Sequence, residues 1–173
     1  HVDDLVVVVE ADTVTVAVDA LSQLDSLIAN GRAPGCPNAV RRGAVAVLSP
    51  SDSAIREVTT LVHHYGGGIS RAVRIPDDDL LDGGAGRVAL ETLDELARDD
   101  DTAVVVLAST PPSPWVAARV LDRAVTTDRA VVACFLGYTA PAPHTGVTLT
   151  ATLEDAARAA ASLSGAGTVS NHP

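Results

Sequence analysis

Short apolar runs alternate with stretches of helical spacing along most of the chain. The runs at 43–49, 69–75, 102–108, 130–136 and 147–150 have the length of strands that are buried on both faces. Between and after them, apolar residues recur every three or four positions at 54–65, 87–98, 113–125 and 152–163. This alternation predicts strands joined by helical crossovers.

Five such strands after residue 38 predict an α/β domain with a flavodoxin-like, doubly wound parallel sheet. Sheets of this kind bind ligands beyond the carboxyl ends of their strands. In this chain those ends are the segments 49–53, 74–79, 109–114 and 137–144. Residues that carry function are therefore expected there.

The N-terminal part of the chain reads as a smaller unit. A strand is expected at 4–10 and a helix at 13–29, followed by a linker at 30–38 that is rich in Gly and Pro. The predicted organisation is an N-terminal strand-helix segment with its linker at 1–37, the flavodoxin-like domain at 38–165 and a frayed tail at 166–173.

Composition removes several classes of function. All twelve cationic side chains are arginines, which excludes a lysine-based phosphate loop and Schiff-base chemistry within this chain. A net charge of −10 opposes binding to nucleic acid. No apolar run is long enough to cross a membrane, and no export signal is recognised. The expected location is the cytoplasm.

Two cysteines, Cys36 and Cys134, are too far apart in sequence to form a metal or redox motif. They are interpreted as one loop thiol and one small core residue. The acidic runs at 76–79 and 99–101 lack the spacing of a calcium loop and are interpreted as solvated loop charge. No metal site is predicted.

Candidate anion-binding groups lie between the first strand and helix of the main domain. Ser51 and Ser53 flank Asp52 at a helix start, where free amides favour an anion. The alternative is that these serines only cap the helix. Glu57, one turn later, is either an orienting partner for a histidine or a solvated carboxylate. His144 follows the fourth strand and is either a general base, or phosphate carrier, or an exposed loop residue.

Several blocks, in order, resemble the FdrA family, whose members are related to the α subunit of succinyl-CoA synthetase and to other nucleoside-diphosphate-forming acyl-CoA ligases. The resemblance rests on these blocks: Asn-Ala-Val-Arg-Arg-Gly at 38–43, Arg-Glu-Val-Thr-Thr-Leu at 56–61, Gly-Gly-Gly-Ile-Ser at 66–70, Leu-Glu-Thr-Leu-Asp at 90–94, Val-Val-Val-Leu at 104–107, Cys-Phe-Leu-Gly at 134–137 and Thr-Leu-Glu-Asp-Ala-Ala at 152–157.

The resemblance implies a ligase-type flavodoxin-like domain that works with other subunits. The FdrA branch has been linked to oxamate carbamoyltransferase, and the ligase branch passes phosphate through a histidine. By position, Glu57 matches the family glutamate and His144 the phosphohistidine. Ser51 and Ser53 stand at the family's phosphate loop, and Asp78 at its Gly-Ile-Gly-Gly-Asp loop. Phosphate, carbamoyl phosphate and CoA are the implied ligands.

Three hypotheses follow. The chain is a shortened FdrA-like subunit of an acyl- or carbamoyl-transfer complex, a non-catalytic assembly or regulatory module, or an acyl-CoA ligase subunit that uses a phosphohistidine. The module hypothesis is motivated by glycines that the family's loops have and this chain lacks, since each such glycine lets backbone amides approach a phosphate. The expected partners are other subunits or a second copy of the chain.

Overall fold

The computed structural model describes residues 8–10, 42–138 and 145–166 and has the flavodoxin-like α/β fold that the sequence predicts. Its strands are β1 (Val8–Glu10), β2 (Arg42–Ser49), β3 (Ile69–Arg74), β4 (Val104–Ser109), β5 (Ala130–Phe135) and β6 (Val147–Thr150). Its helices are α2 (Asp52–His64), α3 (Arg87–Ala97), α4 (Pro114–Val125) and α5 (Leu153–Ala166).

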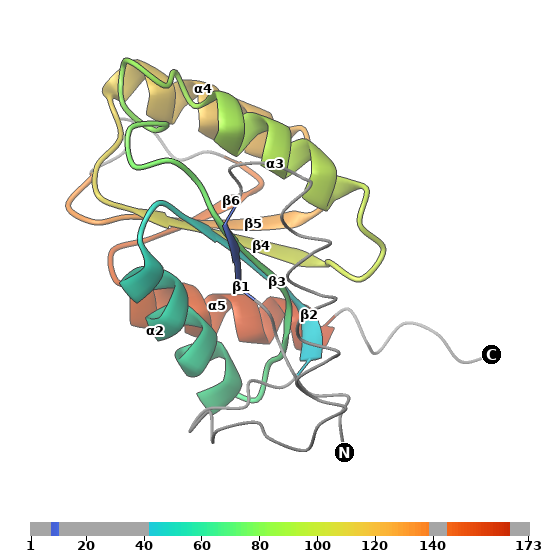
Figure 1. The fold of residues 1–173 in the computed structure, drawn as a ribbon. Helices are drawn as coiled ribbons and strands as arrows, with labels where there is room; N and C mark the ends of the chain where they lie inside the picture. The colour runs from blue at the N-terminus through green and yellow to red at the C-terminus, as the bar shows by residue number, and fades with distance from the viewer. Residues whose placement is uncertain (1–7, 11–41, 139–144, 167–173) are drawn as a thin grey trace, which may run out of the picture.

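All six strands run parallel in one sheet, in the order β1-β3-β2-β4-β5-β6 (Figure 1). The last five strands in sequence have the 2-1-3-4-5 order of flavodoxin-like sheets. Helices α2 and α5 cover one face of the sheet, and α3 and α4 cover the other (Figure 1). The sheet is therefore wound in both directions from β2, and its switch point lies between β2 and β4.

The central strands are apolar at consecutive positions because helices cover both faces of the sheet. In β2, Val45 and Val47 belong to the core on the α2 and α5 side, whereas Ala46 and Leu48 belong to the core on the other side. All six residues of β4 are buried. This explains why the central strands show no alternation of polar and apolar residues.

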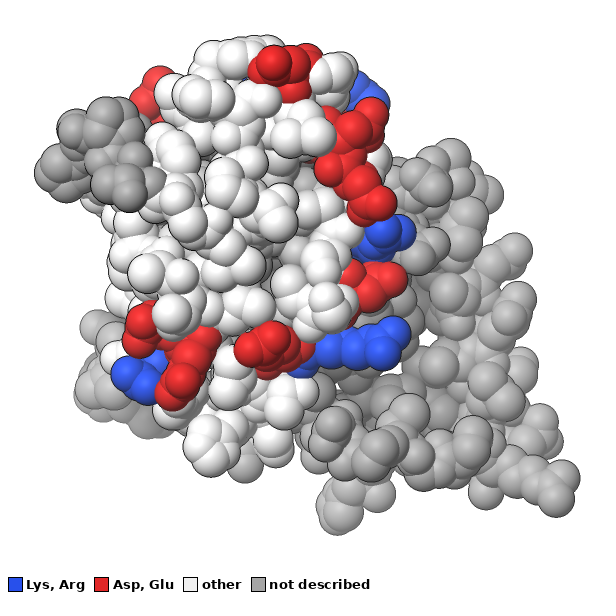
Figure 2. Space-filling view, turned by 90° about the vertical axis from the view of Figure 1, so that its left-hand side faces the viewer, with Lys and Arg blue, Asp and Glu red and all other residues white. Residues whose placement is uncertain are grey.

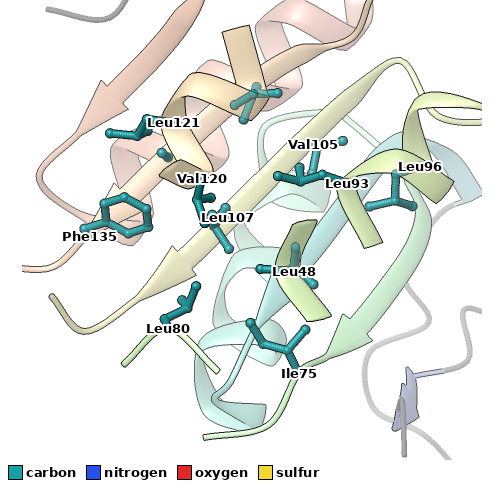
Figure 3. Close-up of a cluster of buried hydrophobic side chains, with 14 of the residues drawn as sticks. Leu48, Ile75, Leu80, Leu93, Leu96, Val105, Leu107, Val120, Leu121 and Phe135 are labelled. Atoms are coloured by element: carbon teal, nitrogen blue, oxygen red, sulfur yellow. The ribbon is translucent and has the colours of Figure 1, made fainter. Parts of the chain in front are cut away.

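The core beneath α3 and α4 is built from larger side chains. Figure 3 shows leucines from both helices resting on β2 and β4. Phe135 of β5 closes one end of this core, and Leu80 and Ile75 close it at the loop after β3. The loop after β3 is thus anchored in the core although it connects elements at the edge of the sheet.

The core beneath α5 uses small side chains. Ala156, Ala157 and Ala160 are fully buried against the sheet together with Val132 and Cys134 of β5. Alanines let the helix axis approach the strands closely. Among the described residues, every buried side-chain nitrogen and oxygen has a hydrogen-bond partner.

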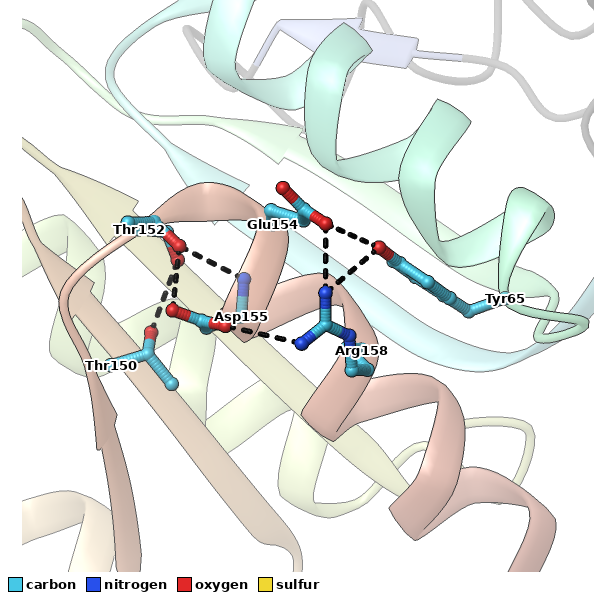
Figure 4. A network of polar contacts seen from close by, with 6 residues as sticks. All are labelled: Tyr65, Thr150, Thr152, Glu154, Asp155 and Arg158. Carbon is cyan, nitrogen blue, oxygen red and sulfur yellow. Dashed lines mark hydrogen bonds and ion pairs between the residues drawn. The ribbon is translucent and has the colours of Figure 1, made fainter.

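A polar network ties α2 to α5 on the outside of this layer (Figure 4). The Tyr65 hydroxyl donates to Glu154 Oε1 at 2.7 Å, and Arg158 Nη2 contacts the same oxygen at 2.7 Å. The Arg158 guanidinium also lies over the Tyr65 ring. The hydrogen bond with Tyr65 is the largest cause that raises the pKa of Arg158. The network fixes how the two helices lie against each other.

The structure differs from the predicted organisation at both ends of the chain. The N-terminal strand pairs with β3, with Val8 opposite Ala72, and so belongs to the main sheet. Helix α5 extends to Ala166, beyond the predicted end at 163, and so includes the first residue that was expected in the tail. The helix expected at 13–29 and the linker at 30–38 lie outside the described residues.

Candidate functional site

The carboxyl edge of the sheet brings together the loops after β2, β3, β4 and β5. At the switch point, Ser49 ends β2 and Ser109 ends β4, and both are buried. The Ser109 hydroxyl donates to the Thr110 carbonyl at 2.6 Å. These loops are where the fold places ligands, so each candidate residue is considered against this edge.

Serine hydroxyls at the start of α2 are engaged with the helix itself. Ser51 is the N-cap residue, and its hydroxyl accepts a hydrogen bond from the Ala54 amide at 3.3 Å. The Ser51 amide donates to Ser49 Oγ at 3.1 Å, and the hydroxyls of Ser51 and Ser53 lie 2.8 Å apart. The capping interpretation of Ser51 is confirmed, because its oxygen satisfies an amide that an anion would otherwise bind.

A cation at the end of β3 is held by two carboxylates. Arg74 Nη2 lies 2.8 Å from Asp77 Oδ1, and its Nε lies 3.5 Å from Asp52 Oδ1. The same Nε donates to the Pro50 carbonyl at 3.3 Å. Asp52, in the first turn of α2, is therefore paired with a cation of the same chain. Arg74 in turn is paired with two acidic groups of the same chain.

Buried Asp79 takes the place of an anion at the start of α3. Its side chain is 2% exposed, with Oδ1 accepting from the Val88 amide at 2.9 Å and Oδ2 from the Ala89 amide at 2.8 Å. Asp78, the residue implied by the family resemblance, is exposed on the surface of the same loop. The carboxylate that binds the start of α3 is thus that of Asp79, the residue after Asp78.

The loop closes around Asp79 because Gly84 packs against it. A Cβ atom at Gly84 would lie 2.3 Å from the Asp79 Cα atom. Gly86, the residue before α3, has φ of +69° and donates its amide to the Asp79 carbonyl at 2.6 Å. Glycine adopts this left-handed conformation without strain. The turn therefore brings a carboxylate from earlier in the loop onto the amides of α3.

A third carboxylate lies at the start of α4. Trp115 Nε1 donates to Asp82 Oδ1 at 2.6 Å. Hydrogen bonds from the side chains of Ser113, the N-cap residue of α4, and of Trp115 lower the pKa of Asp82. The loops after β2 and β3 thus supply an aspartate at or near each of the three helix starts: Asp52, Asp79 and Asp82.

The contact between Asp82 and Trp115 predicts an acid-sensitive fluorescence signal. Because the pKa of Asp82 is lowered on folding, its contribution to stability is present above a pH of about 4 and is lost as the pH falls through the folded-state pKa. We expect the emission of Trp115, the sole tryptophan, to change with a midpoint below the usual carboxyl value of 3.8. In Asp82→Asn this step should be absent, and its persistence there would contradict the assignment.

The structure describes one of the two residues predicted to act in catalysis, Glu57, and does not describe the other, His144. Glu57 is exposed on α2. His144 lies outside the described residues, so its distance to Glu57, Ser51 and Ser53 stays a prediction. His63 and His64 are exposed in the last turn of α2, at the opposite edge of the sheet.

Cys134 behaves as the core residue that its apolar surroundings predict. It is fully buried in β5, and burial is the largest cause that raises the pKa of its thiol. A thiol with a raised pKa is a poor nucleophile at neutral pH. Cys36 lies outside the described residues.

Figure 2 views the molecule from the carboxyl edge, which lies at the left of Figure 1. It shows a broad uncharged surface with carboxylates along its margin and fewer arginines between them. Away from this edge, a shallow groove between α3 and α4 is crossed by an ion pair of Arg123 with Asp94. Within the described ranges, no three His, Cys, Asp or Glu side chains converge as metal ligands do, and no helix could span a membrane.

Residues that sequence reasoning missed are Asp79, Asp82 and Trp115. The signal for Asp79 was weak because its partners lie 9 and 10 positions later in the chain. Asp82 and Trp115 are separated by 33 positions. Local capping rules reach only three or four residues, so neither contact could be derived from spacing.

The chain was compared with known protein families and with known proteins. No protein-family profile matches the chain. The chain is 36% identical over 140 residues to the uncharacterized protein YahF of Escherichia coli (strain K12). The alignment covers 80% of this chain but 27% of that protein. The chain is therefore similar to about a quarter of a much longer polypeptide.

Proposed function

We propose that this chain is the flavodoxin-like subunit of an FdrA-like complex that transfers acyl or carbamoyl groups, and that partner subunits supply the groups that bind and transfer the substrate. The resemblance of its sequence blocks to that family motivates the reaction class. The observation that carries the need for partners is that each helix start at this edge has one of the chain's own carboxylates at or near it: Asp79 accepts from two amides of α3, Asp52 lies in the first turn of α2 and Asp82 contacts Trp115 of α4.

Electrostatics explains why the isolated domain is a poor anion binder. A phosphate at the start of α2 would meet Asp52, and one at the start of α3 would have to displace Asp79 from two amides. The one arginine that ends a strand at this edge, Arg74, is paired with Asp52 and Asp77. Carbamoyl phosphate or CoA phosphates would therefore need cations from another chain.

The test compares the isolated chain with the complex recovered from its native cells. Calorimetry with phosphate, carbamoyl phosphate and CoA should show no binding to the isolated chain at millimolar ligand. The complex should convert oxalurate and phosphate into oxamate and carbamoyl phosphate, or convert a carboxylic acid, CoA and a nucleoside triphosphate into an acyl-CoA, a nucleoside diphosphate and phosphate. Micromolar binding by the isolated chain would overturn the need for partners, and an inactive complex would overturn the reaction class.

The same occupied helix starts favour a second candidate, a non-catalytic module that organises a complex. The two candidates differ in what happens when the chain is left out of a reconstituted complex. A catalytic subunit is required for turnover at any concentration of the other subunits. A scaffold is replaced by raising those concentrations, since it acts through their proximity.

A further inference from the structure

Three of the large apolar side chains exposed in the described structure lie at the carboxyl edge. Leu81 is 47% exposed in the loop after β3, Trp115 is 48% exposed at the start of α4, and Leu136 is 39% exposed directly after β5. We call these three residues the apolar edge face. Exposed apolar groups gathered in one place mark interaction sites more often than scattered ones do.

Backbone contacts show that the three residues belong to neighbouring segments. The Ser113 amide donates to the Leu80 carbonyl at 3.1 Å, which joins the loop of Leu81 to the start of α4. The Leu136 amide donates to the Ser109 carbonyl at 2.9 Å, which places Leu136 beside the end of β4. The apolar edge face thus spans the switch point of the sheet and extends to β5.

Trp115 offers a surface suited to protein contact. Its only polar atom, Nε1, is already satisfied by Asp82 at 2.6 Å. What remains exposed is the apolar part of the indole ring, held in one orientation by that hydrogen bond. Rigid tryptophans of this kind are frequent energetic centres of protein interfaces.

Carboxylates outnumber the cations around this face, although four of them are paired, Asp52 and Asp77 with Arg74, and Glu154 and Asp155 with Arg158. The described loops and helix starts at this edge, residues 50–53, 75–86, 110–115, 136–138, 145–146 and 151–155, contain no lysine or arginine. Six of their carboxylates are exposed: Asp52, Asp77, Asp78, Asp82, Glu154 and Asp155. Figure 2 shows an uncharged surface whose margin carries more acidic groups than arginines.

We propose that the apolar edge face docks a partner protein whose contact surface is apolar at its centre and rich in lysine and arginine at its rim. The inference deepens the proposed function, on which it rests, by locating the contact with another subunit. A second copy of this chain would oppose one acidic rim to another, and nucleic acid or an anionic membrane would be repelled. In the relative YahF the matching stretch is 27% of the protein, so a similar sequence is there joined to further polypeptide.

A cross-linking experiment in the native cells identifies the occupant. The photoreactive residue p-benzoylphenylalanine replaces Leu136 in the full chain, or replaces Leu163 of α5 as a control of nearly equal exposure, 38%. We expect one protein with a basic surface to be cross-linked from Leu136 and not from Leu163. A second copy of this chain, nucleic acid, the same products from both positions or no product would each overturn the proposal.

Binding to the identified partner then tests the surface directly, with Trp115 emission as the readout. We expect Leu81→Asp to weaken binding about 30-fold, as loss of an interface centre does, and Val125→Asp to change it less than about twofold. Raising NaCl from about 50 mM to about 500 mM should weaken binding of the unmodified chain about tenfold because charges are screened. Equal effects of the two substitutions, or affinity independent of salt, would overturn the docking assignment.

Two further measurements keep the outcomes distinct. Circular dichroism and urea unfolding check that Leu81→Asp is folded; if it is not, Asp77→Arg combined with Asp78→Arg serves instead and should weaken binding by reversing rim charge. A complex that assembles through this face but transfers no group contradicts only the proposed function. A complex that transfers groups and is unaffected by these substitutions contradicts only the docking face.

Discussion

Asp79→Ala is expected to lower the free energy of unfolding by about 3 kcal/mol, because two buried amides lose a charged acceptor. The Val88 and Ala89 amides lie at the start of α3 and bond to the carboxylate of a residue that is 2% exposed. The loop that folds around Asp79 also carries Leu80 into the core, so its loosening should extend to the packing of α4. Urea unfolding at neutral pH measures the change.

The neighbouring carboxylate provides the matched control. Asp78→Ala removes the same atoms from an exposed position and should change stability by less than about 0.5 kcal/mol. Asp79→Asn keeps the side-chain volume but offers one oxygen to two amides. Its loss of stability should therefore lie between those of Asp78→Ala and Asp79→Ala. Equal losses at Asp78 and Asp79 would show that the interaction is only general electrostatic attraction to the helix.

Gly43→Ala is expected to destabilise the fold by about 3 kcal/mol, since a new methyl group would collide with backbone that cannot move aside. The added Cβ atom would lie 2.4 Å from the Gly68 Cα atom. The two glycines meet where β2 and β3 begin, next to an irregularity in the register at Arg42 and Val45. Relief would require β2 and β3 to separate locally.

Gly83→Ala serves as the control for Gly43→Ala, because nothing lies within 4 Å of a Cβ atom built at Gly83. That substitution should leave the free energy of unfolding unchanged or raise it by about 0.5 kcal/mol, because alanine gives the unfolded chain less conformational entropy than glycine does. Thermal or urea unfolding of both variants separates a steric clash from the general cost of replacing glycine. A loss below about 1 kcal/mol for Gly43→Ala would mean that the strands can shift apart.

Most of the architecture could be predicted from sequence because it depends on local patterns. Val147–Thr150 was predicted to the residue, and the helical segments expected at 54–65 and 113–125 coincide closely with α2 and α4. The flavodoxin-like order followed from the repetition of strand and helix. Pairing of β1 with β3 was not predictable, since a three-residue contact between distant segments leaves no periodic signal.

The candidate site was less predictable because its chemistry depends on contacts across loops. Ser51 and Ser53 were weighed correctly as capping groups or anion ligands, and the structure confirms that Ser51 caps α2. Asp78 was taken from its place in a family motif, whereas the buried partner of α3 is Asp79. Burial distinguishes two adjacent aspartates, and burial is decided by how the loop turns at Gly84 and Gly86.

The place of β1 at the outer edge has a consequence for biosynthesis. It leaves the ribosome before β2 and β3, but its only partner strand is β3 (Ile69–Arg74), so it has nothing to pair with until that segment has also emerged. At translation rates of about 5–20 residues per second, the delay lasts on the order of seconds. The earliest of the described strands is thus placed onto a sheet that later residues have already built, and a chaperone acting in that interval would meet β1 before its backbone is paired.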